Sequence, residues 1–261
     1  LVVLVVWYFA FWISRKWFGV DDEMSTMIAS SVSICGVSAA IATCGTIRGN
    51  QKKLSYVISL VMVVAIPMLY IMPLLCDWIL PFIFPNNDMA SQQVAGAWLG
   101  GTIDTTAAVA ASGAILGDVA GDTAVIVKAS QNVLLGVAAF AISLFWSVRD
   151  TNSVMETKGT MIWHRFPKFV LGMVIASAVF SIWFKGGVDI DGTMVKYKAI
   201  AKNFQGIFFS IAFVCIGLET RFKEIFTKEN TPSLKAFLTA QTFNIIFTFI
   251  VAVVIFGFIA N

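Results

Sequence analysis

The sequence predicts an all-α, polytopic membrane protein, and three properties of the chain lead to that prediction. Of its 261 residues, 58% are hydrophobic and 13% are charged, whereas a soluble domain is usually about 25% charged. Apolar runs recur, several of them near the ~20 residues that a bilayer core requires. Lys and Arg gather in short polar stretches between the runs, as in membrane loops. We therefore expect the lipid bilayer as the main partner, and the net charge of +3 gives no indication of nucleic acid.

Eight apolar segments are candidate membrane helices in one transmembrane domain that spans residues 1–261. In chain order they are Leu1–Ile13, Met24–Ile47, Leu54–Cys76, Ser91–Leu116, Thr123–Val148, Phe169–Phe184, Gly206–Thr220 and Lys235–Ala260. The first is short, which predicts a fragment whose N-terminal helices are missing. The stretch "DWILPFIFPNNDMA" is interpreted as a loop in the interface. If every segment crosses, the Lys and Arg residues of the loops divide nearly evenly between the two sides, and one re-entrant segment would break that alternation.

The sequence gives no indication of an enzyme or of a cofactor. It contains no GxSxG, HExxH or GxxxxGK[ST] pattern, so nucleophilic, zinc and nucleotide chemistry are not indicated. His164 is the single histidine. The four cysteines lie in apolar runs without a CxxC pair, and we expect them to be small buried residues rather than metal ligands.

The segment "SVSICGVSAAIATCGT" combines serines, glycine and cysteine inside an apolar run. Glycine weakens a helix by about 1 kcal/mol relative to alanine. In lipid, the backbone unwinds only where protein or a water-filled cavity satisfies it. Ser33, Cys35, Gly36 and Ser38 are therefore candidate site residues, and close helix packing is the alternative interpretation.

The segment "WLGGTIDTTAAVAASGA" is the second candidate. Gly100 and Gly101 are expected to break the helix, and the hydroxyls of Thr102, Thr105 and Thr106 follow. Asp104 lies near the middle of the segment, where a carboxylate costs about 2.5–3.5 kcal/mol on insertion scales. We expect it to face a partner, an ion or water, unless it lies at an exposed segment end.

The third candidate is Lys128 in "VIVKASQN", with Gln131 and Asn132 on the following turn. Two interpretations stay open for this lysine. It snorkels to the interface on its long stem, or it points inward to pair with Asp104 or attract an anion. Broken segments with an acid and a lysine are typical of transporter sites.

These residues also resemble the YeiH family, whose members are described as sulfate exporters. "SICGVSAAIA" is similar to the family signature SICGxSAIAA, "GGTIDTTAAVAASGA" to GxSIHxTxxVxAAG, and "VKASQNVLL" to VKxTRxxLL. The weaker stretches "FPKFVLGMVIAS" and "IGLET" follow in the right order, so the resemblance runs over the whole chain. It implies a bacterial inner-membrane carrier with inverted repeats and crossed, broken helices.

This chain departs from the family pattern at two positions. Asp104 stands at the family's His position, and Gln131 stands where the family has Arg. An anion site would become less positive, and a carboxylate suits Na⁺ or H⁺. The departures therefore weaken the expectation of sulfate and favour cation or proton coupling at Asp104.

Three functions follow as hypotheses. The first is a secondary transporter of a small anion, such as sulfate or a sulfonate, coupled to H⁺ or Na⁺. Asp104 would be the coupling acid and Lys128 its partner or the anion anchor. The predicted substrate-binding residues are Ser33, Cys35, Gly36, Ser38, Gly101, Thr102, Asp104, Thr105, Thr106 and Lys128. The second is a cation/proton antiporter that uses an Asp104–Lys128 pair. The third is a membrane receptor, scaffold or channel without transport activity. An oligomer is compatible with each of them.

Overall fold

The computed structural model describes residues 1–149 and 230–259 continuously and only single positions between 172 and 227. The chain divides into two compact units, Leu1–Phe166 with Arg221–Asn261, and Pro167–Thr220. Every element below belongs to the first unit. The predicted segments Phe169–Phe184 and Gly206–Thr220, and His164, lie outside the continuously described residues.

The described residues form helices and no strand, which confirms the all-α prediction for this part of the chain. The α-helices are α1 (Val2–Lys16), α2 (Asp22–Ser30), α3 (Val37–Ile47), α4 (Gln51–Ile83), α5 (Asp88–Thr102), α6 (Thr106–Leu116), α7 (Asp118–Arg149) and α12 (Thr231–Ala252). The π-helical segments are η1 (Ser31–Cys35) and η2 (Val253–Ile259). Within the described residues, two helices, Gln51–Ile83 and Thr231–Phe258, are long and apolar enough to cross a membrane.

The first predicted core segment, Met24–Ile47, folds back on itself as a helical hairpin. The chain enters through α2 and η1, turns at Gly36 and returns through α3. Glu23, at the start of α2, accepts a hydrogen bond from the backbone N–H of Asn50, just beyond α3 (Oε1–N 2.9 Å). At about 1.5 Å per residue, the longer arm rises only about 21 Å, against a bilayer core of about 30 Å. Both ends of this hairpin therefore lie on the same side.

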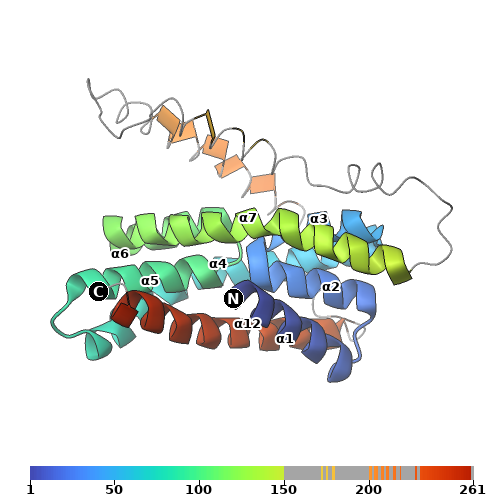
Figure 1. Cartoon of the computed structure of the whole chain (residues 1–261), viewed down its shortest axis with the longest axis horizontal. Coiled ribbons are helices and arrows are strands. Elements are labelled where there is room, and N and C mark those ends of the chain that lie inside the picture. Colours follow the sequence, from blue (N-terminus) through green and yellow to red (C-terminus); the bar gives the residue numbers. More distant parts are fainter. Residues whose placement is uncertain are drawn as a thin grey trace. The chain divides into compact units, whose positions relative to one another are not determined.

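The second core segment, Ser91–Leu116, forms a matching hairpin from α5 and α6. The arms meet in the short non-helical stretch 103–105. A Cβ atom on Gly117, just after α6, would lie 3.5 Å from Oε1 of Gln92 in the first turns of α5. Residues so far apart in sequence meet only if α6 runs back along α5. Figure 1 shows α2 and α3 at one end of the bundle and α5 and α6 at the other, with α7 extending past both hairpins.

These hairpins correct two predictions from the sequence. Met24–Ile47 and Ser91–Leu116 are both interrupted, as expected, but neither crosses the bundle, because the second half of each returns. The stretch predicted as an interface loop after Cys76 is helical as far as Ile83, where α4 ends. Pro67, Pro73 and Pro81 all lie inside α4, which is tolerated where neighbouring groups satisfy the freed backbone.

The two ends of the bundle differ sharply in charge. The basic end holds the C-terminus of α1, both ends of the first hairpin and the start of α4; its basic residues are Arg15, Lys16, Arg48, Lys52 and Lys53. The far end holds the C-terminus of α4, both ends of the second hairpin and the start of α7. The sequence has no Lys or Arg from Leu54 to Val127. The near-even division of basic residues expected from simple alternation therefore does not hold in the described part of the chain.

Helix α12 runs from the basic end to the far end. Near its start, the hydroxyl of Tyr56 in α4 donates to the backbone carbonyl of Asn230 (3.0 Å). Beyond its other end, the ring of Phe258 in η2 lies 6.1 Å from that of Phe84. The helix therefore passes both hairpin tips, which places its side chains within reach of each.

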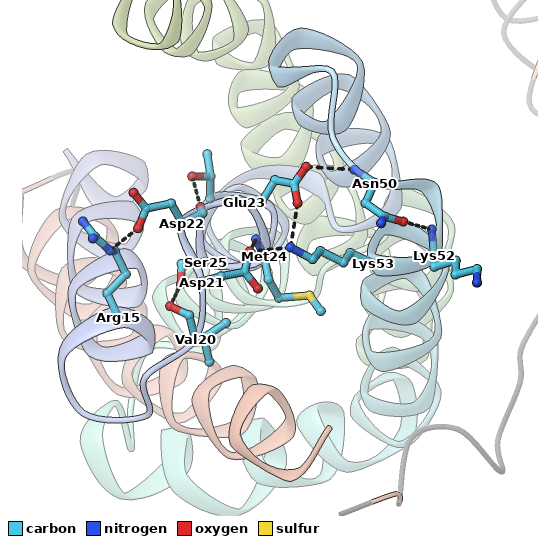
Figure 2. Close-up of polar contacts among 11 residues, drawn as sticks. Arg15, Val20, Asp21, Asp22, Glu23, Met24, Ser25, Asn50, Lys52 and Lys53 are labelled. Atoms are coloured by element: carbon cyan, nitrogen blue, oxygen red, sulfur yellow. Dashed lines mark hydrogen bonds and ion pairs between the residues drawn. The ribbon is translucent and has the colours of Figure 1, made fainter. Parts of the chain in front are cut away.

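Ion pairs hold the loops together at the basic end (Figure 2). Lys53 Nζ lies 2.7 Å from Asp21 and 2.6 Å from Glu23, and Arg15 Nε lies 2.5 Å from Asp22. Asp21 also caps α2 by accepting a backbone N–H at 3.1 Å. Burial alone would raise the pKa of the Asp21 carboxyl, but the hydrogen bonds from Lys53 and from the backbone outweigh burial and lower that pKa.

Candidate functional site

The tips of the two hairpins touch in the middle of the bundle. Gly36 has φ +53°, and a Cβ atom there would lie 2.8 Å from Val61 Cγ1. The same atom would lie 3.0 Å from both the Cβ and the backbone oxygen of Asp104. An L side chain fits neither this backbone conformation nor this space. Glycine at this position thus allows the first tip to contact the second. We call this contact, together with the side chains of α7 and α12 that face it, the crossing.

Polar side chains from α7 and α12 satisfy the backbone at both tips. A helix end leaves carbonyl groups without helical partners, which is costly away from water. The four bonds are Lys128 Nζ to Ile34 O (2.7 Å), Asn244 Nδ2 to Val32 O (3.1 Å), Gln131 Nε2 to Gly101 O (3.2 Å) and Gln241 Nε2 to Thr102 O (3.0 Å). Each of the two helices therefore contacts both hairpins, once at each tip.

Lys128 is inside the bundle, with 2% of its surface exposed. The interpretation that it snorkels to the interface is therefore wrong. Its ammonium group donates to the carbonyl of Ile34 and to Oε1 of Gln131 (3.2 Å). An ammonium has three donors, so one N–H of Lys128 has no bond within the described part of the chain.

Asp104 is equally buried, with 1% exposure. Neither carboxylate oxygen has a hydrogen-bond partner among the described residues. Asp104 and Lys128 lie close enough to interact electrostatically, yet the ion pairs of the described residues do not include them. The site thus holds a lysine bound to backbone and amide oxygens and, close to it, a buried carboxyl group without a hydrogen-bond partner among the described residues.

The predicted site residues divide into three groups by burial. Those buried at or beside the crossing are Ser33, Cys35, Gly36, Gly101, Thr102, Asp104 and Lys128. Thr105 and Thr106 are half-buried: the first caps α6 by accepting the N–H of Ala108 (3.2 Å), and the second accepts from Asn132 (3.3 Å). Ser38 is exposed on α3.

The glycines of the second hairpin have a different role from the predicted one. Helix α5 continues through Gly100 and Gly101 and ends at Thr102. A Cβ atom on Gly96 would lie 2.4 Å from the carbonyl of Ala120, and one on Gly100 would lie 2.4 Å from that of Ala124. This spacing of small residues lets α5 and α7 pack backbone to backbone. The helix breaks later, at residues 103–105.

Sequence reasoning missed the contribution of α12. Gln241, Asn244 and Thr248 are buried polar residues of α12, whose other buried residues, apart from Ser233, are apolar. Thr248 donates to Oδ1 of Asn244 (2.9 Å), so both polar atoms of the Asn244 side chain have a partner. Their spacing of three and four residues places them on one helix face, and this spacing was the available signal.

The two returning helices also shape the electrostatics of the crossing. Helices α3 and α6 both begin at the tips, so the positive ends of their dipoles face the crossing. Helix α3 has no side-chain cap. Within the described residues, no group of three or more His, Cys, Asp or Glu side chains could hold a metal ion. Two shallow grooves on the outer surface of α1, both lined by Tyr8 and Trp12, do not include residues of the crossing.

Comparison with known proteins identifies a family. The family described as "Conserved hypothetical protein 698" matches residues 1–236. A UPF0324 membrane protein of Nitratidesulfovibrio vulgaris is 38% identical over 243 residues, which cover 90% of this chain and 40% of the relative. A UPF0324 membrane protein of Rhodopirellula baltica is 36% identical over 264 residues, which cover 98% of this chain and 46% of the relative. No solved structure matches the chain.

The chain spans less than half the length of these relatives. The match nevertheless covers most of the chain itself, and the resemblance to the YeiH family is confirmed, because that is the same family. The names of the relatives and the two long apolar helices also agree with a membrane location. The chain belongs to the conserved hypothetical protein 698 family, the UPF0324 membrane proteins.

Proposed function

We propose that this chain is the core of a secondary transporter that moves a small anion, such as sulfate or a sulfonate, across a bacterial inner membrane in exchange for or together with H⁺ or Na⁺. The observation that carries the proposal is the contact between two opposed, interrupted hairpins at Gly36 and Asp104. Half-helices that end near the middle of a membrane offer dipole ends and free backbone groups to a substrate. The matching hairpins also support the inverted repeat that the family resemblance implies.

Three positive groups at the crossing support an anion as substrate. The N-terminal ends of α3 and α6 face it, and backbone N–H groups at such ends bind anions readily. Lys128 is the third, with one N–H not bonded within the described chain. Because Lys128 is already held by two acceptors, it is positioned before the anion arrives.

Asp104 supports coupling to a cation. A buried carboxylate without a hydrogen-bond partner is expensive, and binding H⁺ or Na⁺ removes that cost. The gain and loss of this cation would change the charge beside the anion and thereby link the two movements.

A cation/proton antiporter is the second candidate. The observation that favours it is that Asp104 and Lys128 interact without an ion pair. Gain or loss of a cation at one of the two groups would therefore change the charge beside the other. Antiport would require that flux depend on Na⁺ and pH but on no anion.

The charge distribution supports one orientation. Basic residues prefer the cytoplasmic side, so the basic end faces the cytoplasm and the far end faces outward. A cysteine placed at Asn86, in the far-end loop between α4 and α5, should react with a membrane-impermeant maleimide in intact cells. One placed at Asn50 should react only after the cells are opened, and the reverse pattern would refute this orientation.

Anion flux in proteoliposomes tests the proposed function. Radiolabelled sulfate and a sulfonate would be driven by a pH or Na⁺ gradient in the wild type and in Asp104→Asn and Lys128→Ala. We expect both variants to lose at least about tenfold in rate, since tenfold corresponds to ~1.4 kcal/mol and a hydrogen bond to a charged group is worth about 1.5–3 kcal/mol.

Lys53→Ala is the matched control, because it removes a lysine from the ion pairs of the basic end instead of the crossing. Its rate should stay within about twofold of the wild type, as surface ion pairs contribute about 0–1 kcal/mol. Wild-type flux with unchanged rates in both crossing variants would show that the site is misassigned. If neither the pH gradient nor the Na⁺ gradient drives anion flux in the wild type, the transporter proposal is wrong.

A further inference from the structure

The unpartnered polar atoms of the described chain are concentrated near the hairpin tips. Buried side-chain atoms without a hydrogen-bond partner among the described residues are Ser33 Oγ, Thr102 Oγ1, both carboxylate oxygens of Asp104, Ser112 Oγ, Asn132 Oδ1 and Gln241 Oε1. All of them are oxygens. Buried polar atoms nearly always have partners, so a group of exceptions calls for a physical explanation.

Four of these residues belong to the crossing. Thr102 is the last residue of α5 before the break of the second hairpin, and Asp104 lies within that break. Ser33 lies between the two first-tip residues whose carbonyls accept hydrogen bonds from α7 and α12. Gln241 binds the carbonyl of Thr102 and lies beside the Asp104 carboxylate. All four side chains are at least 98% buried.

The nearby hydrogen-bond donors are already used. The side-chain amide of Gln241 donates to Thr102 O (3.0 Å) and to Met68 Sδ (3.3 Å), which leaves only its oxygen free. Lys128 directs two of its donors to Ile34 and Gln131. A single proton on Asp104 would supply one donor, whereas carboxylate, amide and hydroxyl oxygens from three chain segments remain to be satisfied.

From this oxygen set we infer a site for a dehydrated monovalent cation, Na⁺, held by Asp104 with Thr102, Gln241 and Ser33. The inference rests on the proposed function, and it narrows the coupling ion from H⁺ or Na⁺ to Na⁺. Hard cations take several oxygen ligands at once, and unwound backbone and half-helix ends are where transporters bind Na⁺. Asp104 neutralises the bound charge, while Lys128 is held away from it by its own acceptors.

Gln241 has a specific part in this site. It ties α12 to the tip of the second hairpin through Thr102 and offers its oxygen to the cation. The oxygen of Asn244, the other buried amide of α12, already accepts a hydrogen bond from Thr248. The structure thus distinguishes two amides of one helix face: Gln241 is a candidate ligand, and Asn244 only supports the first tip.

Thermal unfolding of the purified protein in detergent tests the site without measuring transport. NaCl would be exchanged for choline chloride at constant ionic strength. We expect a saturable rise in the wild-type melting temperature of about 5–10 °C at a hundredfold excess of Na⁺ over Kd. Asp104→Asn, Thr102→Val and Gln241→Leu should lose the Na⁺ dependence, whereas Thr102→Ser, which keeps the hydroxyl, should retain it.

Ser112→Ala is the matched control, because it deletes a buried, unpartnered hydroxyl in α6 that lies away from the tips. It should keep the full Na⁺ shift. If Thr102→Val or Gln241→Leu lowers the melting temperature equally in both salts and keeps the Na⁺ shift, the residue has only a structural role. That result would overturn the proposed Na⁺ site. A wild-type protein that responds to pH but not to Na⁺ would overturn it as well.

The two proposals can fail separately. Anion flux driven by a pH gradient, with no Na⁺ shift, would leave the proposed function standing and remove the Na⁺ site. A Na⁺ shift that depends on Asp104, in a protein without anion flux, would support the site and refute anion transport.

Discussion

Lys53 at the basic end lies between two carboxylates and at the edge of solvent, whereas Lys128 at the crossing is buried and bonded to backbone and amide oxygens. The acids differ in the same way: Asp21 is paired and half exposed, and Asp104 is buried without a partner. Exposed ion pairs contribute little stability, and buried charges cost a great deal. The charges at the basic end therefore have partners within the chain, whereas the Asp104 carboxylate at the crossing has none among the described residues. Three experiments test this difference between the crossing and the basic end.

The largest effect should come from filling the contact between the tips. Gly36→Ala adds a Cβ 2.8 Å from Val61 and 3.0 Å from Asp104, at φ +53°. We expect a loss of about 2–4 kcal/mol in the free energy of unfolding, measured by denaturant titration in mixed micelles. Gly45→Ala in the same hairpin is the control, because nothing lies within 4 Å of its Cβ position. It should be neutral or stabilising by up to about 1 kcal/mol. Equal effects of the two variants would show that the tips do not touch.

A smaller effect is expected from removing one support of a tip. Asn244→Leu leaves the carbonyl of Val32 and the hydroxyl of Thr248 without their partners. The expected loss is about 1–3 kcal/mol in unfolding free energy. Thr242→Val, on the exposed face of α12, removes a hydroxyl that bonds only within its own helix and should change stability by less than about 0.5 kcal/mol. If Asn244→Leu changes the free energy of unfolding by as little as Thr242→Val does, the backbone carbonyl of Val32 at the first tip does not depend on α12.

The smallest effect belongs to the basic end. Lys53→Met removes both of its ion pairs and should cost about 1 kcal/mol or less at pH 7, and less still in high salt. The Asp21 pKa is lowered from 3.8 in the folded chain, so the stability it contributes is present above pH 3.8 and is lost as the pH falls through the lowered pKa. Melting curves of the wild type and Lys53→Met should therefore converge in acid. A difference that persists unchanged to pH 2 would contradict this pairing.

Much of the site could be predicted from the sequence because polar residues inside apolar runs are rare and costly. Asp104, Lys128 and the small-residue segments around Gly36 and Thr102 were identified in this way, and the structure brings them together. The roles of Gln241 and Asn244 were not predicted, because a few polar residues in a largely apolar helix do not by themselves indicate a site. Their importance depends on which carbonyl they face. The two glycines before Thr102 were misread, since a glycine that permits close packing and one that breaks a helix look alike in a sequence.

The amino-acid sequence alone was enough to predict an all-α membrane protein and to locate the charged groups that are costly to bury. The apolar composition predicts helices in a lipid bilayer. Because burying Asp104 and Lys128 separately is costly, we expect the two residues to share a polar environment. Three features became apparent only in the folded structure. The two interrupted segments turn back instead of crossing, and all the basic loops of the described chain lie at one end. Helices α7 and α12 each support both tips. The physical reason is that a helix break frees the same backbone groups whether the chain continues or returns. The neighbours that satisfy those groups, Lys128, Gln131, Gln241 and Asn244, come from distant parts of the chain.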